Sequence, residues 1–285
     1  MIPASFEYTR ASSLRDALAA LAKGDGAKVL AGGHSLIPMM KFRLAQPGRL
    51  IDIGRLSELK GVAEHRRGAR IGALTTYREI LESDLLRERY PLLAEATQGI
   101  GDVQVRNRGT IGGSLAHADP ASDTPAIMVA LDAGFALRSK RGKRTVPARE
   151  FFLAPFSTAL AEDELLVEIT LPPLPRGAGT AYVSFNQAAS GYPLAAAAAV
   201  IARSRKTVSH AVVALSGLGD VARLVQAAEQ LVGSKGEPDA IARVAAAAPE
   251  GLEIQGDIHA PAPYRRHLVT VATREALTRA LERAK

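Results

Sequence analysis

The 285-residue chain contains no cysteine. It therefore cannot form a disulfide, ligate an iron–sulfur cluster, build a thiolate zinc site or use a cysteine nucleophile. Tryptophan is also absent, and aromatic residues make up only 5% of the chain. Hydrophobic residues nevertheless make up 47%, so a sizeable core can form, built mainly of alanine, valine, leucine and isoleucine.

The chain also lacks a long apolar run. No segment approaches the ~18 uninterrupted apolar residues that a membrane-spanning helix needs, so we expect no transmembrane segment. The first residues, Met1, Ile2, Pro3 and Ala4, do not combine a basic stretch with an apolar one, so a signal peptide is not expected. With no disulfide chemistry to suggest secretion, we expect a cytoplasmic protein.

The formal charge of +7 raises the question of an anionic partner such as nucleic acid. The basic residues are dispersed, and the densest run lies at 138–144 around Gly142. Aromatic residues that could stack on bases do not interleave with this run. We interpret it as a solvated hairpin tip and expect no nucleic-acid binding.

The first fifty residues alternate between helix and strand patterns. Ser13, followed three residues later by Asp16, resembles a capping box at the start of a helix. The pattern then predicts a strand over 28–31, a helix over 34–44 and a second strand over 50–53. This order is typical of a small βαβ-like unit and favours a parallel pair of strands.

The middle of the chain has a different pattern. Thr76 and Glu79 form a second possible capping box, and Pro91 suits the first turn of another helix. A long, polar, glycine-rich connection follows over 99–123, and connections of this length are usually functional. The remaining elements expected here are a helix over 125–131 and strands over 69–74, 133–139, 144–147 and 165–171.

Pro172, Pro173 and Pro175, together with Gly177 and Gly179, indicate a domain boundary. Beyond them the pattern predicts strands over 181–187, 195–202 and 208–216, and helices over 224–231, 240–248 and 264–283. We find no internal repeat. The fold class is therefore α/β (α+β), with units at 1–58, 59–175 and 176–285, the last holding a three-stranded antiparallel sheet and helices.

Two glycine loops carry the functional signal. In the first, a strand runs into Gly32 and Gly33, then a polar pair and a helix. Glycine has no Cβ, so a phosphate can approach its backbone, and a helix N-terminus offers free N–H groups at the same place. The alternative interpretation is an ordinary strand–helix turn.

The second loop places Gly112 and Gly113 beside Thr110 and Ser114. Successive N–H groups in such a turn can form an anion-binding concavity. Asp123, further along, could instead cap the following helix. Two such loops in adjacent units suggest one diphosphate held from both sides, as in a dinucleotide.

Competing motifs are weak. Gly99 and Gly101 lack the third glycine of a dinucleotide fingerprint, because position 104 is Gln104. No phosphate-loop sequence occurs, and the run from Gly112 fails the G-x-S-x-G pattern at its last position. His117 and Asp119 are too few to hold a metal. We therefore expect neither a metal site nor an acid–base catalytic group on this chain.

At these residues the chain resembles a known family, the FAD-binding medium subunits of the xanthine dehydrogenase and aerobic carbon monoxide dehydrogenase group of molybdenum hydroxylases. The similar segments are 31–41, 71–76 and 108–123, and the resemblance continues to 264–268. It implies a two-part, PCMH-like FAD-binding domain with the flavin between its parts, followed by a C-terminal domain.

The resemblance also implies a set of cofactor-binding residues. Asp123 would hydrogen-bond the cofactor, Leu166 would pack on its flavin or adenine side, and Tyr192 would lie close to the flavin ring. Related enzymes place a lysine where this chain has Asn186, and an amide stabilises a reduced, anionic flavin less well. The other residues of the set are Val29, Leu30, Ala31, Gly32, Gly33, His34, Ser35, Leu36, Thr110, Ile111, Gly112, Gly113, Ser114 and His117.

By the same resemblance, the chain is the electron-transfer subunit of a heterotrimer, assembled as a dimer of heterotrimers. A large subunit would carry the molybdopterin cofactor and a small subunit two 2Fe–2S clusters. Electrons would pass through the clusters to this chain's FAD and on to an external acceptor, and the absence of cysteine agrees with this division.

Two alternatives from other classes stay open at this point. One is a self-contained flavin reductase or oxidase related to the enolpyruvyl reductase of cell-wall synthesis. The other is a non-enzymatic dinucleotide-binding regulator. Family substrates include carbon monoxide, nicotine-like heterocycles, purines and aldehydes, and this chain's sequence names none of them.

Overall fold

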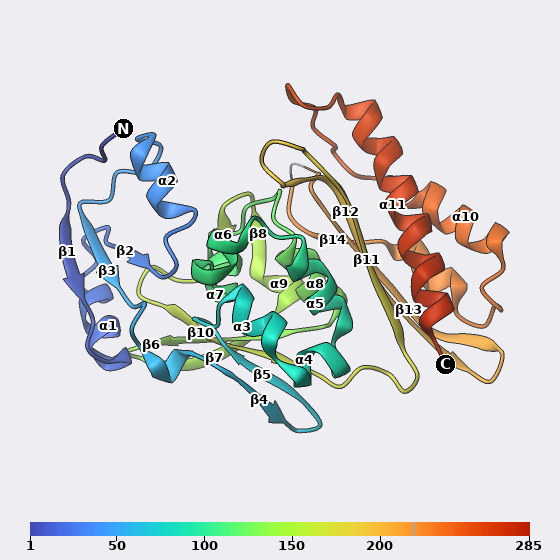
Figure 1. Cartoon of the computed structure of the whole chain (residues 1–285), viewed down its shortest axis with the longest axis horizontal. Coiled ribbons are helices and arrows are strands. Elements are labelled where there is room, and N and C mark those ends of the chain that lie inside the picture. The colour runs from blue at the N-terminus through green and yellow to red at the C-terminus, as the bar shows by residue number, and fades with distance from the viewer. Residues whose placement is uncertain (219) are drawn as a thin grey trace.

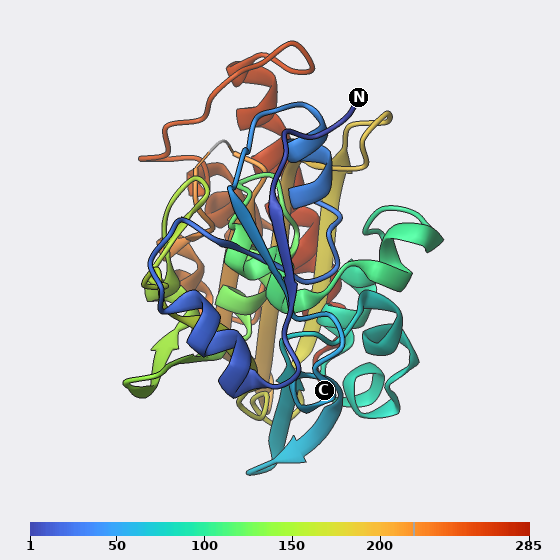
Figure 2. The ribbon, with the colours of Figure 1, turned by 90° about the vertical axis from the view of Figure 1, so that its left-hand side faces the viewer.

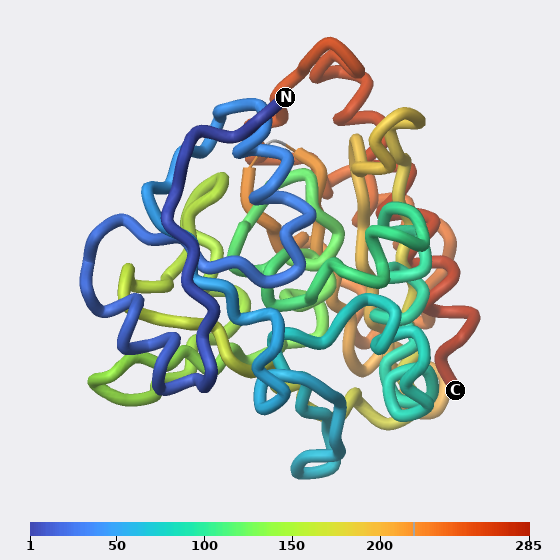
Figure 3. Tube along the Cα trace, turned by 60° about the vertical axis from the view of Figure 1, so that its left-hand side comes forward, coloured from blue at the N-terminus to red at the C-terminus, as the bar shows by residue number. Residues whose placement is uncertain are grey.

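The computed structural model describes residues 1–218 and 220–285. In these ranges the main chain forms three larger sheets that follow one another along the sequence, and one two-stranded sheet (Figure 1). Figure 2, turned by 90°, brings the N-terminal sheet to the front. The N-terminus lies on this first unit and the C-terminus at the end of the last helix (Figure 3). No helix in the described ranges is both long and apolar enough to cross a membrane.

The first sheet is parallel, with the strand order β1-β3-β2. The parallel pair predicted from the βαβ-like pattern is therefore present. Its elements are β1 Glu7–Arg10, α1 Leu14–Leu21, β2 Lys28–Leu30, α2 Leu36–Lys41 and β3 Arg49–Asp52. The sequence did not predict β1, because all four of its residues are exposed and show no apolar alternation.

The two helices of this unit differ from the prediction in detail. Ser13 accepts a hydrogen bond from the Asp16 N–H, but the Asp16 carboxylate accepts from the Ser12 N–H rather than completing a capping box at Ser13. The helix predicted over 34–44 is shorter, because α2 begins at Leu36 and ends at Lys41. Arg43, just beyond it, has a φ of 60°, which an α-helix cannot continue through.

The middle sheet is antiparallel, in the order β4-β5-β10-β6-β7. The predicted strands and the capping box at Thr76 are confirmed, as is Pro91 in the first turn of its helix. Its strands are β4 Val62–His65, β5 Gly68–Gly72, β6 Gly134–Ser139, β7 Gly142–Pro147 and β10 Leu165–Leu171, with a small pair β8 Phe152–Ala154 and β9 Ser157–Thr158.

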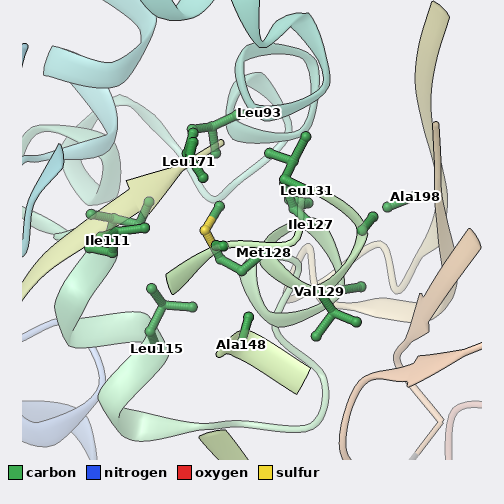
Figure 4. Packing of buried hydrophobic residues seen from close by; sticks show 14 of the residues in the cluster. Leu93, Ile111, Leu115, Ile127, Met128, Val129, Leu131, Ala148, Leu171 and Ala198 are labelled. Carbon is green, nitrogen blue, oxygen red and sulfur yellow. The ribbon is translucent and has the colours of Figure 1, made fainter. Parts of the chain in front are cut away.

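Helices cover this sheet and enclose the largest hydrophobic core of the chain. Figure 4 shows α8 at its centre, with Met128 and Ile127 packed between Ile111 and Leu115 of α7 and residues of neighbouring elements. The helices of this unit are α3 Tyr77–Glu82, α4 Asp84–Arg89, α5 Pro91–Gln98, α6 Val103–Arg108, α7 Ile111–His117, α8 Thr124–Ala130 and α9 Ala148–Phe151.

The long connection expected over 99–123 was only partly a loop. It contains α6 and α7, each of which begins at a side-chain cap. Asp102 accepts from the Val105 N–H at 2.8 Å, and Thr110 accepts from the Gly113 N–H at 3.2 Å. The sequence pattern did not predict these helices, because glycines flank the short α6 and lie inside α7, although the caps of both helices are ordinary ones.

The last sheet is antiparallel, in the order β11-β12-β13-β14, and α11 packs along it. Its three long strands were predicted, but the helix expected over 224–231 is instead the two-residue β14 followed by a 3-10 turn, Gln226–Leu231. The elements of this unit are β11 Gly179–Asn186, β12 Pro193–Ser204, β13 Thr207–Ser216, β14 Arg223–Leu224, α10 Pro238–Ala247 and α11 Ala262–Arg283. The alanine run of β12 is fully buried, so small side chains let the helix and sheet approach closely.

Candidate functional site

The two glycine loops, about eighty residues apart in the sequence, lie against each other. A Cβ on Gly32 would come within 2.1 Å of the Arg108 carbonyl oxygen and 3.1 Å of the Gly109 Cα. A Cβ on Gly113 would lie 3.8 Å from the Cβ of Ala31. The loops therefore border one place between the first two units of the fold, as the two-loop hypothesis requires.

The first loop presents a row of unused backbone donors. The N–H groups of Gly32, Gly33, His34 and Ser35 make no hydrogen bond to any residue of the described ranges. Gly33 has a φ of +78°, which turns the chain into this conformation, and the His34 Nδ1 lies 2.9 Å from the Gly32 carbonyl oxygen. Consecutive free N–H groups at the start of a helix suit a bound diphosphate.

The second loop is different, and the structure corrects the reason for expecting an anion there. The N–H of Ile111 donates to the Thr75 carbonyl at 3.0 Å, and that of Gly112 donates to the Ala73 carbonyl at 2.9 Å. The N–H of Gly113 donates to the Thr110 hydroxyl. These donors are occupied within the chain, so the predicted concavity of free N–H groups is not formed.

What the second loop offers instead is a group of hydroxyls. The Ser114 Oγ lies 2.9 Å from the Ser122 Oγ and 2.7 Å from the Thr124 Oγ1. Ser114 and Ser122 are only half-buried, so they can also hydrogen-bond a bound polar molecule. The sequence patterns had not singled out Thr124, which is fully buried and begins α8.

Asp123 stands at the N-cap position of α8 but makes no capping bond with its side chain. Its Oδ1 instead accepts a hydrogen bond from the Tyr182 hydroxyl at 2.6 Å. Burial raises the pKa of the Asp123 carboxyl to about 6, although the bond from Tyr182 acts in the opposite direction. Tyr182 was missed by the sequence patterns, because a tyrosine in a strand is usually a core residue.

A cavity of about 350 Å³ opens beside this pair, between α5, β11 and α11. It lies between the second and third units, a common position for ligand pockets. The residues that line it are Glu95, Ala96, Gly99, Asp123, Tyr182, Val183, Ser184, Phe185, Glu275 and Arg279.

The remaining predicted residues are placed as follows. His117 ends α7 with its ring centroid 5.2 Å from that of Phe156, and burial lowers the pKa of its imidazole. Asn186 and Tyr192 lie on one hairpin, where both side chains are exposed. Leu166 is 6% exposed and packs in the main core rather than lining an opening.

The Tyr192 hydroxyl interacts with the charges of the loop between α7 and α8. Although Tyr192 is 42% exposed, its partial burial raises the pKa of its hydroxyl, and the charges of Asp119 and Asp123 raise it further. The structure therefore brings Tyr192 towards Asp123 although they are far apart in the sequence. Within the described ranges, no group of three or more His, Asp or Glu side chains could hold a metal ion.

The fold and the paired loops define a dinucleotide-binding α/β protein with an added C-terminal domain. Residues 4–174 match the family described as the FAD binding domain in molybdopterin dehydrogenase, and residues 180–280 match the CO dehydrogenase flavoprotein C-terminal domain. The chain belongs to this family of FAD-binding molybdopterin dehydrogenase subunits.

Several relatives match along nearly their whole length. The chain is 41% identical to the carbon monoxide dehydrogenase medium chain of Hydrogenophaga pseudoflava, covering 99% of each. It is 39% identical to the glyceraldehyde dehydrogenase medium chain of Sulfolobus acidocaldarius, covering 97% of this chain and 98% of that one. A solved structure of the Hydrogenophaga pseudoflava carbon monoxide dehydrogenase that lacks the Mo-pyranopterin moiety superposes with a TM-score of 0.97 at 42% identity, covering 100% of both chains.

The family resemblance and the fold class predicted from the sequence are thus confirmed, as is the prediction of an FAD-binding oxidoreductase subunit similar to carbon monoxide dehydrogenase medium chains. The alternative of a self-contained flavin reductase or oxidase finds no support among these relatives. The free donors of the first loop and the hydroxyls of the second fit the polar groups of FAD.

Proposed function

We propose that this chain holds FAD between its two glycine loops and relays electrons inside a three-subunit molybdenum hydroxylase. The observation that carries the proposal is the row of four free N–H groups from Gly32 to Ser35, in a loop that packs against Arg108 and Gly109 just before the second loop. When bound, FAD supplies redox chemistry in one-electron or two-electron steps, and the protein supplies binding and electrostatics.

In this arrangement the first loop holds the diphosphate. Ser114 and Ser122 offer hydroxyls to neighbouring polar groups of the cofactor. Asp123 accepts a hydrogen bond from it, and Tyr192 covers its ring. We leave three of the expected residues out of the proposed cofactor-binding set, because Leu166 and Ile111 are core residues and Gly112 packs against Ala73. The proposed set is Val29, Leu30, Ala31, Gly32, Gly33, His34, Ser35, Leu36, Thr110, Gly113, Ser114, His117, Asp123, Asn186 and Tyr192.

The partners follow from what the chain lacks. Without cysteine it cannot hold an iron–sulfur cluster, so its electrons come from elsewhere. The relatives are named as medium chains or subunits of dehydrogenases. We propose a large subunit with the molybdopterin cofactor, a small subunit with two 2Fe–2S clusters, and an external electron acceptor, in a cytoplasmic dimer of heterotrimers.

We place the choice of organic substrate in the large subunit. Relatives of this chain belong, by name, to dehydrogenases of carbon monoxide, glyceraldehyde and 6-hydroxypseudooxynicotine. Each is matched along essentially the whole chain, so one medium-subunit fold serves different substrates. We also propose the functional division at 1–58, 59–175 and 176–285, with the cofactor between the first two units.

Reconstitution tests the proposal. The chain is purified and denatured, and the released chromophore is identified by chromatography, where we expect FAD. Candidate substrates are then assayed by dye reduction with the three polypeptides together and with the FAD-loaded chain alone. We expect turnover from the complete set, and only reduction by an artificial reductant from the single chain. Release of FMN, or sustained turnover of a substrate by this chain alone, would contradict the proposal.

A further inference from the structure

The contact between Asp123 and Tyr182 joins two units of the fold. Asp123 lies on the loop between α7 and α8, which we assign to the cofactor, whereas Tyr182 lies on β11 of the C-terminal sheet. Their side chains meet at 2.6 Å, and the two residues are 8% and 7% exposed. A buried hydrogen bond to a carboxylate is among the stronger ones in proteins, and its geometry is fixed by packing.

The carboxyl of Asp123 has one described side-chain donor, the Tyr182 hydroxyl. Burial disfavours the carboxylate and raises the pKa of this group to about 6, and the bond from Tyr182 counteracts that effect. The other titratable or charged groups nearby are Tyr77 of α3, Tyr192 and Asp119 of two loops, Glu95 of α5, and Glu275 and Arg279 of α11. The nearby cations are paired: Arg279 with Glu275, and Arg283 of α11 with Glu95.

We propose that Tyr182 is a positioning residue for the cofactor site: its hydroxyl orients the Asp123 carboxyl and keeps it an ionised hydrogen-bond acceptor for FAD. The C-terminal sheet thereby takes part in cofactor binding through the Asp123 carboxyl. This inference rests on the proposed function, because it assigns Tyr182 a role towards the same FAD.

The role differs from ordinary core packing in one measurable way. Replacing Tyr182 by Phe removes the hydroxyl and leaves the ring in place. Without the donor, the pKa of Asp123 rises further, so the protonated form becomes populated near neutral pH. FAD affinity then falls at neutral pH and recovers in alkali, where the carboxyl ionises again. A loss of packing alone would weaken binding equally at every pH.

The experiment titrates the full-length apoprotein with FAD by fluorescence quenching between pH ~5.5 and ~8.5. For the wild type we expect constant affinity above pH ~7 and weaker binding as the pH falls through the titration of Asp123. For Tyr182→Phe we expect Kd to rise ~2–10-fold at pH 7 and to return to within ~2-fold of wild type at pH 8.5, corresponding to a pKa shift of ~1–2 units. Asp123→Asn should bind weakly and lose this pH dependence.

Tyr90→Phe is the matched control. Tyr90 is also a buried tyrosine, 1% exposed, but its hydroxyl donates to the carbonyls of Leu171 and Pro172, away from the cofactor loop. It should cost stability without moving the pH profile of FAD affinity. A Tyr182→Phe protein with wild-type affinity at pH 7, or with the same loss at pH 8.5, would overturn the inference. A wild-type chain that binds no FAD at any pH would instead overturn the proposed function.

Discussion

A Cβ on Gly112 would lie 2.5 Å from the Cβ of Ala73 and 2.6 Å from its carbonyl oxygen. The first turn of α7 thus rests on the chain just after β5, and the Gly112 N–H donates to that same carbonyl. From the sequence, this glycine suggested a place where phosphate approaches the backbone. The structure shows that the absence of a Cβ at Gly112 is needed for the packing of α7 against the chain after β5.

Gly112→Ala should therefore impair folding rather than the cofactor contact itself. Overpacking a tight site costs ~1–3 kcal/mol, and we expect a loss of this size in the free energy of unfolding of the apoprotein, measured by urea denaturation. Gly48→Ala is the control, because no atom lies within 4 Å of its Cβ position and its φ is not positive. Unchanged stability in Gly112→Ala with a selective loss of FAD would contradict this assignment.

Gly33 is expected to behave in the opposite way. Its φ of +78° disfavours any residue with a Cβ, and its N–H belongs to the free row of the first loop. Gly33→Ala should cost ~1 kcal/mol of stability and also weaken FAD binding by at least ~10-fold, because the row of donors is displaced. The measurement is a flavin titration of the apoprotein beside a urea curve.

Gly26 provides a matched control for this variant. Its φ is +71°, so alanine there meets nearly the same backbone strain, but it lies in the α1–β2 connection with no atom within 4 Å of its Cβ position. Gly26→Ala should lose the share of stability that backbone strain accounts for and keep its FAD affinity, whereas the Cβ of Gly33→Ala would in addition lie 2.7 Å from the Ile37 Cδ1. Equal losses of affinity in both variants would mean that the first loop does not hold the diphosphate.

These glycines show which structural features could be predicted from the sequence and which could not. Local signals sufficed for the longer buried strands, for the Thr76 capping box and for the free first loop, because each depends on residues close together in the chain; the exposed strand β1 and the short strands β4, β8, β9 and β14 were not predicted. The helix α7 was missed because its cap, Thr110, is followed by glycines that usually indicate a loop. The bond between Asp123 and Tyr182 spans 59 positions, and only the packing of the C-terminal sheet brings these residues together.

Arg265 and Asp257 form a clamp at the end of the C-terminal sheet. The Arg265 guanidinium is buried and donates to the carbonyls of Leu194 and Gly217 at 3.0 and 2.9 Å, and to the Asp257 carboxylate at 2.6 Å. The hydrogen bond from Arg265 lowers the pKa of Asp257 to about 2. Asp257 also accepts from the His259 N–H, so one carboxylate holds the chain that leads into α11.

A carboxyl with a lowered pKa stabilises the fold above its usual titration range and loses that effect as the pH falls towards 2. Asp257→Asn should therefore lower the Tm at pH 7, and the difference from wild type should shrink as the pH falls below ~4. Glu82→Gln, which breaks the exposed pair with Arg78, should leave the free energy of unfolding almost unchanged. A Tm difference for Asp257→Asn that is independent of pH would contradict the clamp.

Asn186 stands where the family resemblance leads us to expect a lysine. Its side chain is exposed at the end of β11, and the adjacent Gln187 N–H donates to the carbonyl of Tyr192 at 2.9 Å, so both residues belong to the hairpin placed near the flavin. Asn186→Lys would add a positive charge there. A cation favours the anionic reduced flavin, so the midpoint potential should rise.

The exposure of Asn186 limits the size of this effect. An exposed charge interaction is worth at most ~1 kcal/mol, which for a two-electron couple corresponds to ~20 mV. Potentiometric titration of the FAD-loaded chain measures the shift, and it should shrink as salt is added, because exposed charges are screened. Asn186→Gln controls for the longer side chain and should leave the potential unchanged. A Lys variant with an unchanged or lower potential at low salt would show that residue 186 does not face the flavin.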